Sequence, residues 1–184
     1  MRQKLIVVML SFTMTLTMLL TTKLNATDDA KSLEKKVFSE FKEVIPKENI
    51  KTVDDLYKRW SEVREELHAG KSKVVILDIR TEAEFDSGHI CDSNNIDSGL
   101  VYTVPEKIPD TDTEIWVFCR TQNRGVYFTG LLMKYGYKKV YLVEKGIAGW
   151  AEKGYPLVNK YMGEIKVTNY QHKFKEGFSF RENK

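Results

Sequence analysis

The first two segments with a regular hydrophobic pattern have apolar residues at helical spacing. In residues 28–45 the apolar positions are Leu33, Val37, Phe38, Phe41, Val44 and Ile45. This spacing predicts an amphipathic helix that ends at Pro46, because proline cannot continue a helix. A second stripe lies before Gly70 and consists of Val53, Leu56, Trp60, Val63 and Leu67. Thr52 and Asp55 have the spacing of an N-cap, so a second helix is predicted to begin there.

The pattern then changes to short, continuous apolar runs at residues 74–77, 115–118 and 140–143. Runs of this length are typical of strands that are buried on both faces of a parallel sheet. The segments between and around them have helical patterns. Strands that alternate with helices predict an α/β fold, in which helices flank both faces of a mostly parallel sheet.

Three further elements are predicted in the second half of the chain. Residues 125–135 form a helical pattern before Gly136, with apolar positions at Tyr127, Leu131, Leu132 and Tyr135. A last short helix is expected at residues 147–153, which Gly154 follows. Beyond residue 158 the chain is polar and charged, with one strand pattern at residues 164–168.

The N-terminal 26 residues have the pattern of a secretory signal peptide. Arg2 and Lys4 precede an uncharged run at residues 5–20, and the segment ends in Leu24-Asn25-Ala26. An uncleaved anchor is the alternative, but an apolar run of 16 residues is short of the ~20 that span a bilayer. We therefore expect a periplasmic or secreted bacterial protein with no stable membrane insertion after cleavage.

Charge excludes several classes of protein. Among 184 residues, 29 Lys and Arg stand against 26 Asp and Glu, a net charge of +3. The surplus consists of Arg2, Lys4 and Lys23, so the chain after residue 26 is neutral overall. A neutral body argues against a nucleic-acid partner and against a polybasic membrane surface. Two Cys exclude a disulfide-stapled scaffold and a four-thiolate zinc site.

The second apolar run leads directly into a cysteine. Cys119 follows the predicted strand at residues 115–118, and the helix at 125–135 begins shortly after it. Ligands of parallel sheets bind at the carboxyl ends of the strands. Loop N–H groups, the helix N-terminus, Arg120 and Arg124 would all favour the thiolate of Cys119 over its thiol. Position alone leaves a second interpretation equally open, in which Cys119 simply ends a buried strand.

From about residue 52 to residue 157 the chain resembles a single rhodanese-like sulfurtransferase domain. Five matching segments occur in the order of the family: Asp78-Ile79-Arg80, then Glu84-Phe85 with Gly88-His89-Ile90, then Asn95-Ile96, then Cys119 to Arg124, then Gly146 to Trp150 with Gly154 to Leu157. Any one match is weak, whereas five in order over about a hundred residues identify the family.

The resemblance implies a flavodoxin-like, three-layer fold with a five-stranded, mostly parallel sheet. It implies that Cys119 takes sulfane sulfur from a donor and holds it as a persulfide, without a metal or an organic cofactor. The loop residues that would bind substrate are Arg120, Thr121, Gln122, Asn123 and Arg124. Small sulfur-containing anions are the expected substrates, and a thiol-bearing acceptor protein is a further expected partner. Asp78 and Arg80 are expected to form a supporting ion pair that orients the loop.

The length of the loop separates this activity from that of related phosphatases. Cys119 to Arg124 is six residues, as in sulfur-transferring members of the family. The tyrosine-phosphatase pattern needs an arginine at position 125, which is Gly125. A non-catalytic binding module remains the alternative, and the presence of Cys119 in a basic loop favours the enzyme.

Two departures from the family pattern carry expectations of their own. Gln122 stands where the loop commonly has glycine, and it would be strained if that position needed a positive φ. Cys91, the only other thiol, is expected near the amino ends of the strands, too far from Cys119 for a disulfide. In all, four parts are predicted: a signal peptide (1–26), a helical extension (27–50), the rhodanese-like domain (51–158) and a polar C-terminal extension (159–184).

Overall fold

The computed structural model describes residues 29–161 and 163–167. The predicted signal peptide and most of the polar C-terminal extension lie outside these residues. Contacts divide the chain into two compact units, Met1–Glu40 and Phe41–Lys184. Residues 29–44 are helical, in agreement with the apolar spacing. In the described part of the chain, no helix combines the length and the hydropathy needed to cross a membrane.

The second unit is built on a five-stranded sheet with the order β1-β5-β4-β2-β3. Its strands are β1 (Ile50–Lys51), β2 (Val74–Asp78), β3 (Asn94–Asn95), β4 (Glu114–Phe118) and β5 (Lys139–Val143). Every pairing in the sheet is parallel. The three apolar runs of the sequence are β2, β4 and β5, which occupy its centre. The predicted parallel sheet is therefore confirmed.

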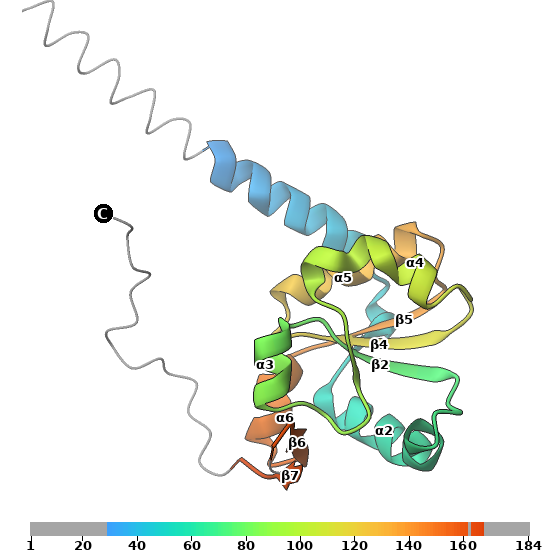
Figure 1. Cartoon of the computed structure of the whole chain (residues 1–184). Helices are drawn as coiled ribbons and strands as arrows, with labels where there is room; N and C mark the ends of the chain where they lie inside the picture. The colour runs from blue at the N-terminus through green and yellow to red at the C-terminus, as the bar shows by residue number, and fades with distance from the viewer. Residues whose placement is uncertain (1–28, 162, 168–184) are drawn as a thin grey trace, which may run out of the picture. The chain divides into compact units, whose positions relative to one another are not determined.

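Helices cover both faces of this sheet (Figure 1). They are α2 (Val53–His68), α3 (Glu82–Ser87), α4 (Val104–Lys107), α5 (Asn123–Lys134) and α6 (Gly146–Glu152), with two 3₁₀ turns, η1 (Lys47–Asn49) and η2 (Ser98–Thr103). Capping boxes at Thr52 and Thr81 begin α2 and α3, so the predicted N-cap at Thr52 is confirmed. Each box satisfies backbone N–H groups that a helix leaves unpaired at its start.

Alternation along the strands divides the core into two layers of packing. Ile76 and Trp116 face α2 and α6, where they join a cluster with Trp60 and Trp150. Leu77 and Val117, one position later in each strand, face the other way. They belong to a second cluster, with Val104 and with Phe128 and Leu132 of α5. The sheet is thus the middle of three layers, because successive side chains of a strand point to opposite faces.

Two elements differ in detail from the sequence-based prediction. The apolar residues predicted at helical spacing on α5 are not all buried, since Tyr135 is 42% exposed. Tyr127 is half-buried and contacts Phe41, with 5.4 Å between ring centroids. The strand predicted at 164–168 is β7 (Gly163–Ile165), which pairs antiparallel with β6 (Leu157–Asn159) in a separate two-stranded sheet.

Candidate active site

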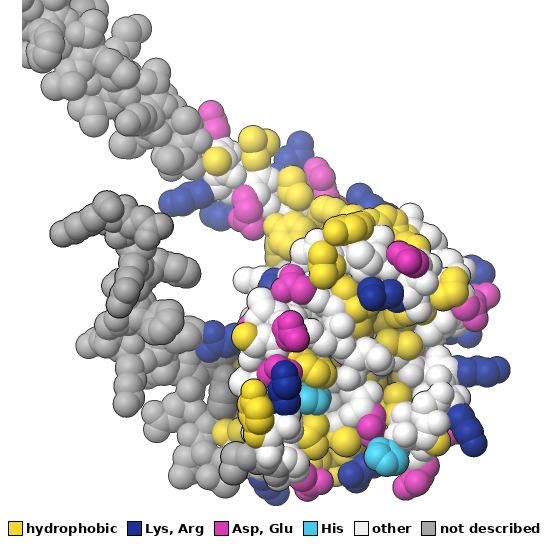
Figure 2. All heavy atoms as spheres, viewed as in Figure 1, with side chains coloured by type: hydrophobic (Ala, Val, Ile, Leu, Met, Phe, Trp, Pro, Cys, Tyr) yellow, Lys and Arg dark blue, Asp and Glu magenta, His cyan; other side chains and the backbone are white. Residues whose placement is uncertain are grey.

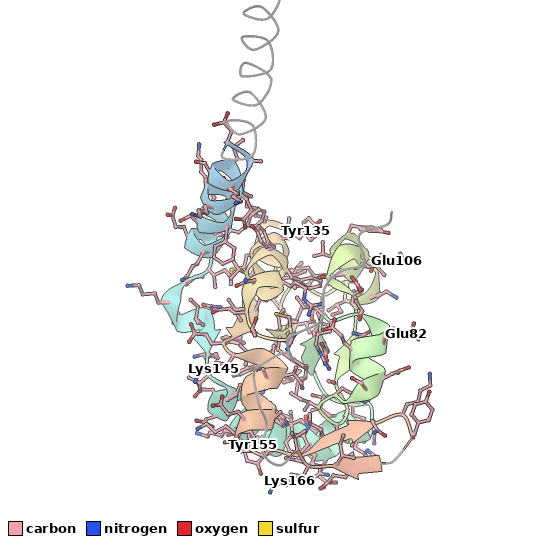
Figure 3. The ribbon with its side chains drawn as sticks, turned by 90° about the vertical axis from the view of Figure 1, so that its left-hand side faces the viewer. Glu82, Glu106, Tyr135, Lys145, Tyr155 and Lys166 are labelled. Atoms are coloured by element: carbon pink, nitrogen blue, oxygen red, sulfur yellow. The ribbon has the colours of Figure 1, made fainter. Side chains whose placement is uncertain are left out.

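Cys119 lies at the carboxyl edge of the sheet, directly after β4 and four residues before α5. Its side chain is almost fully buried, with 2% of its surface exposed, among the residues that pack against α5. Figure 3 looks onto this edge, with Glu82 at the start of α3 on one side and Lys145 at the start of α6 on the other. The strand, loop and helix that the sequence predicts around Cys119 are therefore present.

The N-terminus of α6 holds the backbone of the loop. Ile147 N donates to Cys119 O at 2.9 Å, and Ala148 N donates to Arg120 O at 3.0 Å. Gly146 makes this approach close, because a Cβ atom at its position would overlap Cys119 O. Its φ of +48° is also in the left-handed region that favours glycine. The two carbonyls are thus fixed by a helix start that lies 25 or more residues later in the chain.

Arg124, the last residue of the loop, is bound by α3. Its guanidinium donates to both carboxylate oxygens of Glu84, at 2.9 Å and 3.0 Å. This bidentate pair lowers the pKa of Glu84 to about 2. The pKa of Arg124 is raised mainly by Glu84, with smaller contributions from Cys119 and Asp78. Arg124 therefore acts on Cys119 electrostatically, while its hydrogen bonds go to Glu84.

The ion pair of Asp78 and Arg80 forms as predicted and is buried. Arg80 Nη2 lies 2.6 Å from Asp78 Oδ2, and the same nitrogen donates to Gly88 O at 2.7 Å. Gly88 ends α3. The pair consequently fixes α3, and α3 in turn fixes Arg124 through Glu84. The pair is thus connected to the loop through that helix, and its role in orienting the loop stays a prediction.

The remaining loop residues are placed around Cys119 as follows. Arg120, Thr121 and Gln122 are half-buried, and Asn123 is exposed as the first residue of α5. A role for these side chains in binding substrate stays a prediction. The strain expected at Gln122 is absent, because its φ of −162° is extended backbone. The left-handed conformation occurs instead at Lys145, the N-cap of α6, with a φ of 60°.

His89 has a structural role at the end of α3. Its Nδ1 lies 2.9 Å from Phe85 O, and its ring stacks on that of Phe85 with 3.7 Å between centroids. Its backbone also exchanges two hydrogen bonds with Val158 of β6. His89 thus connects the end of α3 to the two-stranded sheet.

A groove of about 1070 Å³ lies at the opposite edge of the sheet from Cys119. Its lining includes Val74, Glu114 and Lys139, which are the first residues of β2, β4 and β5. Both charge signs line it, including Arg59, which pairs with Glu114. Because Cys119 follows the other end of β4, this groove does not contribute to the candidate site.

The ion pair between Glu84 and Arg124 makes the stability of the fold depend on pH. Folding lowers the pKa of Glu84 from 4.5 to about 2, so this contribution is complete above pH 4.5 and is lost as pH falls toward 2. The full shift is worth at most ~3.4 kcal/mol, and we expect ~1 kcal/mol because both side chains are about a third exposed to screening solvent. Chemical denaturation from pH 6 to pH 2 tests this. Glu84→Gln is expected to flatten that part of the profile, and an unchanged slope would contradict the assignment.

The second thiol is on the other side of the sheet. Cys91 packs against the cluster that contains Trp60, whereas Cys119 belongs to the cluster against α5. Trp60 Nε1 donates to Cys91 O at 3.0 Å, which holds this turn in place. Burial, together with the neighbouring Asp92, raises the pKa of the Cys91 thiol. We expect no Cys91–Cys119 disulfide, and non-reducing peptide mapping of oxidised monomer would contradict this if it found the linked peptides.

Comparison with protein families identifies the domain that contains this site. Residues 59–153 match the model of the rhodanese-like domain. The chain belongs to the rhodanese-like family. A relative described as a sulfurtransferase, from Allochromatium vinosum, is 33% identical to it over 90 residues. That alignment covers 49% of this chain and 83% of the relative.

A solved structure shares the fold of this rhodanese-like protein. A protein of unknown function from Rhodopseudomonas palustris, described as a possible tyrosine phosphatase, matches with a TM-score of 0.53 at 22% identity. The match covers 67% of this chain and 92% of that protein. Thiosulfate sulfurtransferase from Pseudomonas aeruginosa has a TM-score of 0.47 at 25% identity over 60% of this chain. The chain spans only 20% of the length of that second protein.

The sequence did not single out two groups that hold the loop. In the sequence Glu84 stands out only as part of a family segment. Its place on a capped helix after Arg80 nevertheless indicates a position at the carboxyl edge of the sheet. The contact of Gly146 with Cys119 O is the second. Its signal in the sequence is a glycine that lies three residues after the end of a strand and directly before a predicted helix, where close backbone approach is common.

Proposed function

We propose that this rhodanese-like protein is a sulfurtransferase in which Cys119 carries sulfur as a persulfide. The observation that carries the proposal is the position of Cys119 in a six-residue loop, between a strand end and the start of α5. Family membership and a relative described as a sulfurtransferase support the same class of reaction. The proposed donors are thiosulfate, polysulfide or a persulfide, and the proposed setting is the periplasm or the exterior of a bacterium.

In the first half-reaction the Cys119 thiolate attacks the outer sulfur of the donor. With thiosulfate, a new S–S bond forms to Cys119, the original S–S bond breaks, and sulfite leaves with its electron pair. The product is a persulfide anion on Cys119. Loop N–H groups and the N-terminus of α5 supply the positive potential that stabilises both the thiolate and this anion.

In the second half-reaction a thiophilic acceptor attacks the outer sulfur of the persulfide. Cyanide would leave as thiocyanate, sulfite as thiosulfate, and a thiol as a new persulfide, while the electron pair of the broken S–S bond returns to Cys119. Because no net redox change occurs, the cycle needs no cofactor. The two steps predict ping-pong kinetics. Initial rates with thiosulfate and cyanide should give parallel double-reciprocal lines, and intersecting lines would contradict a persulfide intermediate.

The two arginines of the loop are expected to differ in their effect on turnover. Arg124→Ala removes a charge that acts on Cys119 and also leaves Glu84 without its bidentate partner. We therefore expect turnover to fall ~10–100-fold, the scale of one lost charge contact of about 1.4–3 kcal/mol. Arg120→Ala is expected to have a smaller effect. Steady-state turnover and the pH dependence of iodoacetamide alkylation measure this, and equal values for both variants would contradict it.

A further inference from the structure

A carboxylate outside the loop, that of Glu144, contacts the loop that holds Cys119. β4 and β5 pair in parallel, with Trp116 opposite Tyr141 and Val117 opposite Leu142. Continuing that register by two residues brings Glu144 alongside Cys119. The backbone of Glu144 is fixed there, since its N–H donates to Lys51 O at 2.8 Å. Its position relative to the loop is thus set by the sheet itself.

The side chain of Glu144 is exposed and reaches the loop. Gln122 Nε2 donates to Glu144 Oε1 at 3.4 Å, and this contact connects the end of β5 with the N-cap of α5. The family position that is commonly glycine thus carries, in this chain, an amide that donates to a carboxylate at the end of β5. Because Gln122 belongs to the loop, this negative charge acts on anions that bind there.

One neighbouring cation is directed elsewhere. The Lys51 ammonium lies over the Tyr141 ring, 5.5 Å from its centroid. It is thus held against β5.

Carboxylates from outside the loop offset part of its positive charge. The positive side chains of the loop are Arg120 and Arg124, and the neighbouring negative ones are Glu84 and Glu144. Glu84 is bound to Arg124 in a bidentate pair. The loop is therefore less positive than residues 119–124 suggest when they are considered by themselves. On the face drawn in Figure 2, acidic and basic side chains are likewise interspersed.

We propose that Glu144 is a specificity-determining residue that disfavours dianionic sulfur donors relative to monoanionic ones. This inference rests on the sulfurtransferase function proposed above and narrows its substrate class. The favoured donors are alkyl thiosulfonates and the persulfides of uncharged thiols. The disfavoured donor is thiosulfate, which carries a second negative charge on its leaving group. Coulombic repulsion is proportional to the charge of the donor, so a dianion is affected twice as strongly in free energy.

Thiosulfate and methanethiosulfonate form a matched pair of probes. They have the same sulfane sulfur and a similar shape, but a methyl group replaces one anionic oxygen in the second. Attack by Cys119 on methanethiosulfonate forms the same persulfide, breaks the same S–S bond and releases methanesulfinate with its electron pair. Both probes meet the same thiolate, so the ratio of their rate constants is independent of the reactivity of Cys119.

The test compares the two donors in Glu144→Gln, which keeps the shape of the side chain and removes its charge. We expect kcat/KM for persulfide formation to rise ~9-fold with thiosulfate and ~3-fold with methanethiosulfonate. The first fold-change is the square of the second because a doubled charge doubles the change in free energy. The ratio of the two constants should therefore rise ~3-fold. In 0.5 M salt this gain should shrink, because exposed charges are screened.

Glu152→Gln is the control, since it removes the same charge from the exposed far end of α6. It should leave the ratio at the wild-type value, and a change as large as that of Glu144→Gln would overturn the proposal. If both donors form the persulfide and Glu144→Gln does not change their ratio, the inference about Glu144 is wrong while the sulfurtransferase function stands. If neither of these donors nor polysulfide forms a persulfide on wild-type protein, the proposed function itself fails.

Discussion

Replacing Gly146 by alanine is expected to lower sulfur transfer at least ~100-fold, the scale of a misplaced reacting group. A Cβ atom at this position would overlap Cys119 O, and alanine would also be strained at a φ of +48°. Either the start of α6 or the Cys119 carbonyl must shift, and the bonds from Ile147 and Ala148 to the loop would be lost or lengthened. The free energy of unfolding should fall by about 2–4 kcal/mol. Turnover and urea denaturation measure the two effects.

Gly70→Ala is the matched control for this prediction. Gly70 also has a positive φ, +65°, but a Cβ atom there would meet nothing within 4 Å. It should cost about 1 kcal/mol of stability from left-handed strain and leave turnover unchanged. Wild-type activity in Gly146→Ala would show that the contact with Cys119 O does not position the loop.

Replacing Cys119 by serine is expected to reduce sulfur transfer to the uncatalysed background. Serine is nearly isosteric with cysteine, but its hydroxyl provides no thiolate to attack sulfur and no persulfide to carry it. The fold should persist, with a change in unfolding free energy within about 1–2 kcal/mol at this buried position. Thiocyanate production and circular dichroism report on activity and fold separately.

Cys91→Ser is the companion variant. Cys91 lies on the opposite side of the sheet, in contact with the cluster around Trp60. Its replacement should preserve sulfur transfer, which would show that the loss in Cys119→Ser is specific to one thiol. Retained turnover in Cys119→Ser, with normal circular dichroism, would assign the chemistry to another group.

Much of the fold follows from the hydrophobic pattern, because its central strands are continuous apolar runs. β2, β4 and β5 were predicted to within one residue at either end. The edge strand β3 was not predicted, because two residues, Asn94–Asn95, carry no hydrophobic period. They pair with the end of β2 once the apolar core is formed. Tyr135 is exposed for a related reason. An aromatic residue at helical spacing is buried only where a neighbouring element covers it, and the spacing does not show where that happens.

The candidate site was predictable where it is local in sequence. The strand, Cys119 and the start of α5 are contiguous, so one stretch of chain determined their arrangement. The partners that hold the loop are distant: Glu84 is 40 residues from Arg124. Likewise, the Gln122–Glu144 contact joins residues 22 apart. Charge counted along the loop alone therefore overstated its positive character, because the compensating carboxylates come from α3 and from the end of β5.

Mass spectrometry of the Cys119 peptide tests the central proposal most directly. The protein is first reduced, then exposed to thiosulfate or polysulfide, trapped with iodoacetamide and digested. The account predicts that the peptide containing Cys119 gains about 32 Da, one sulfur atom, and loses it again when cyanide is added. The Cys91 peptide should remain unchanged in the same sample. A Cys119 peptide that gains no sulfur from either donor would contradict the sulfurtransferase mechanism and favour a non-catalytic binding module.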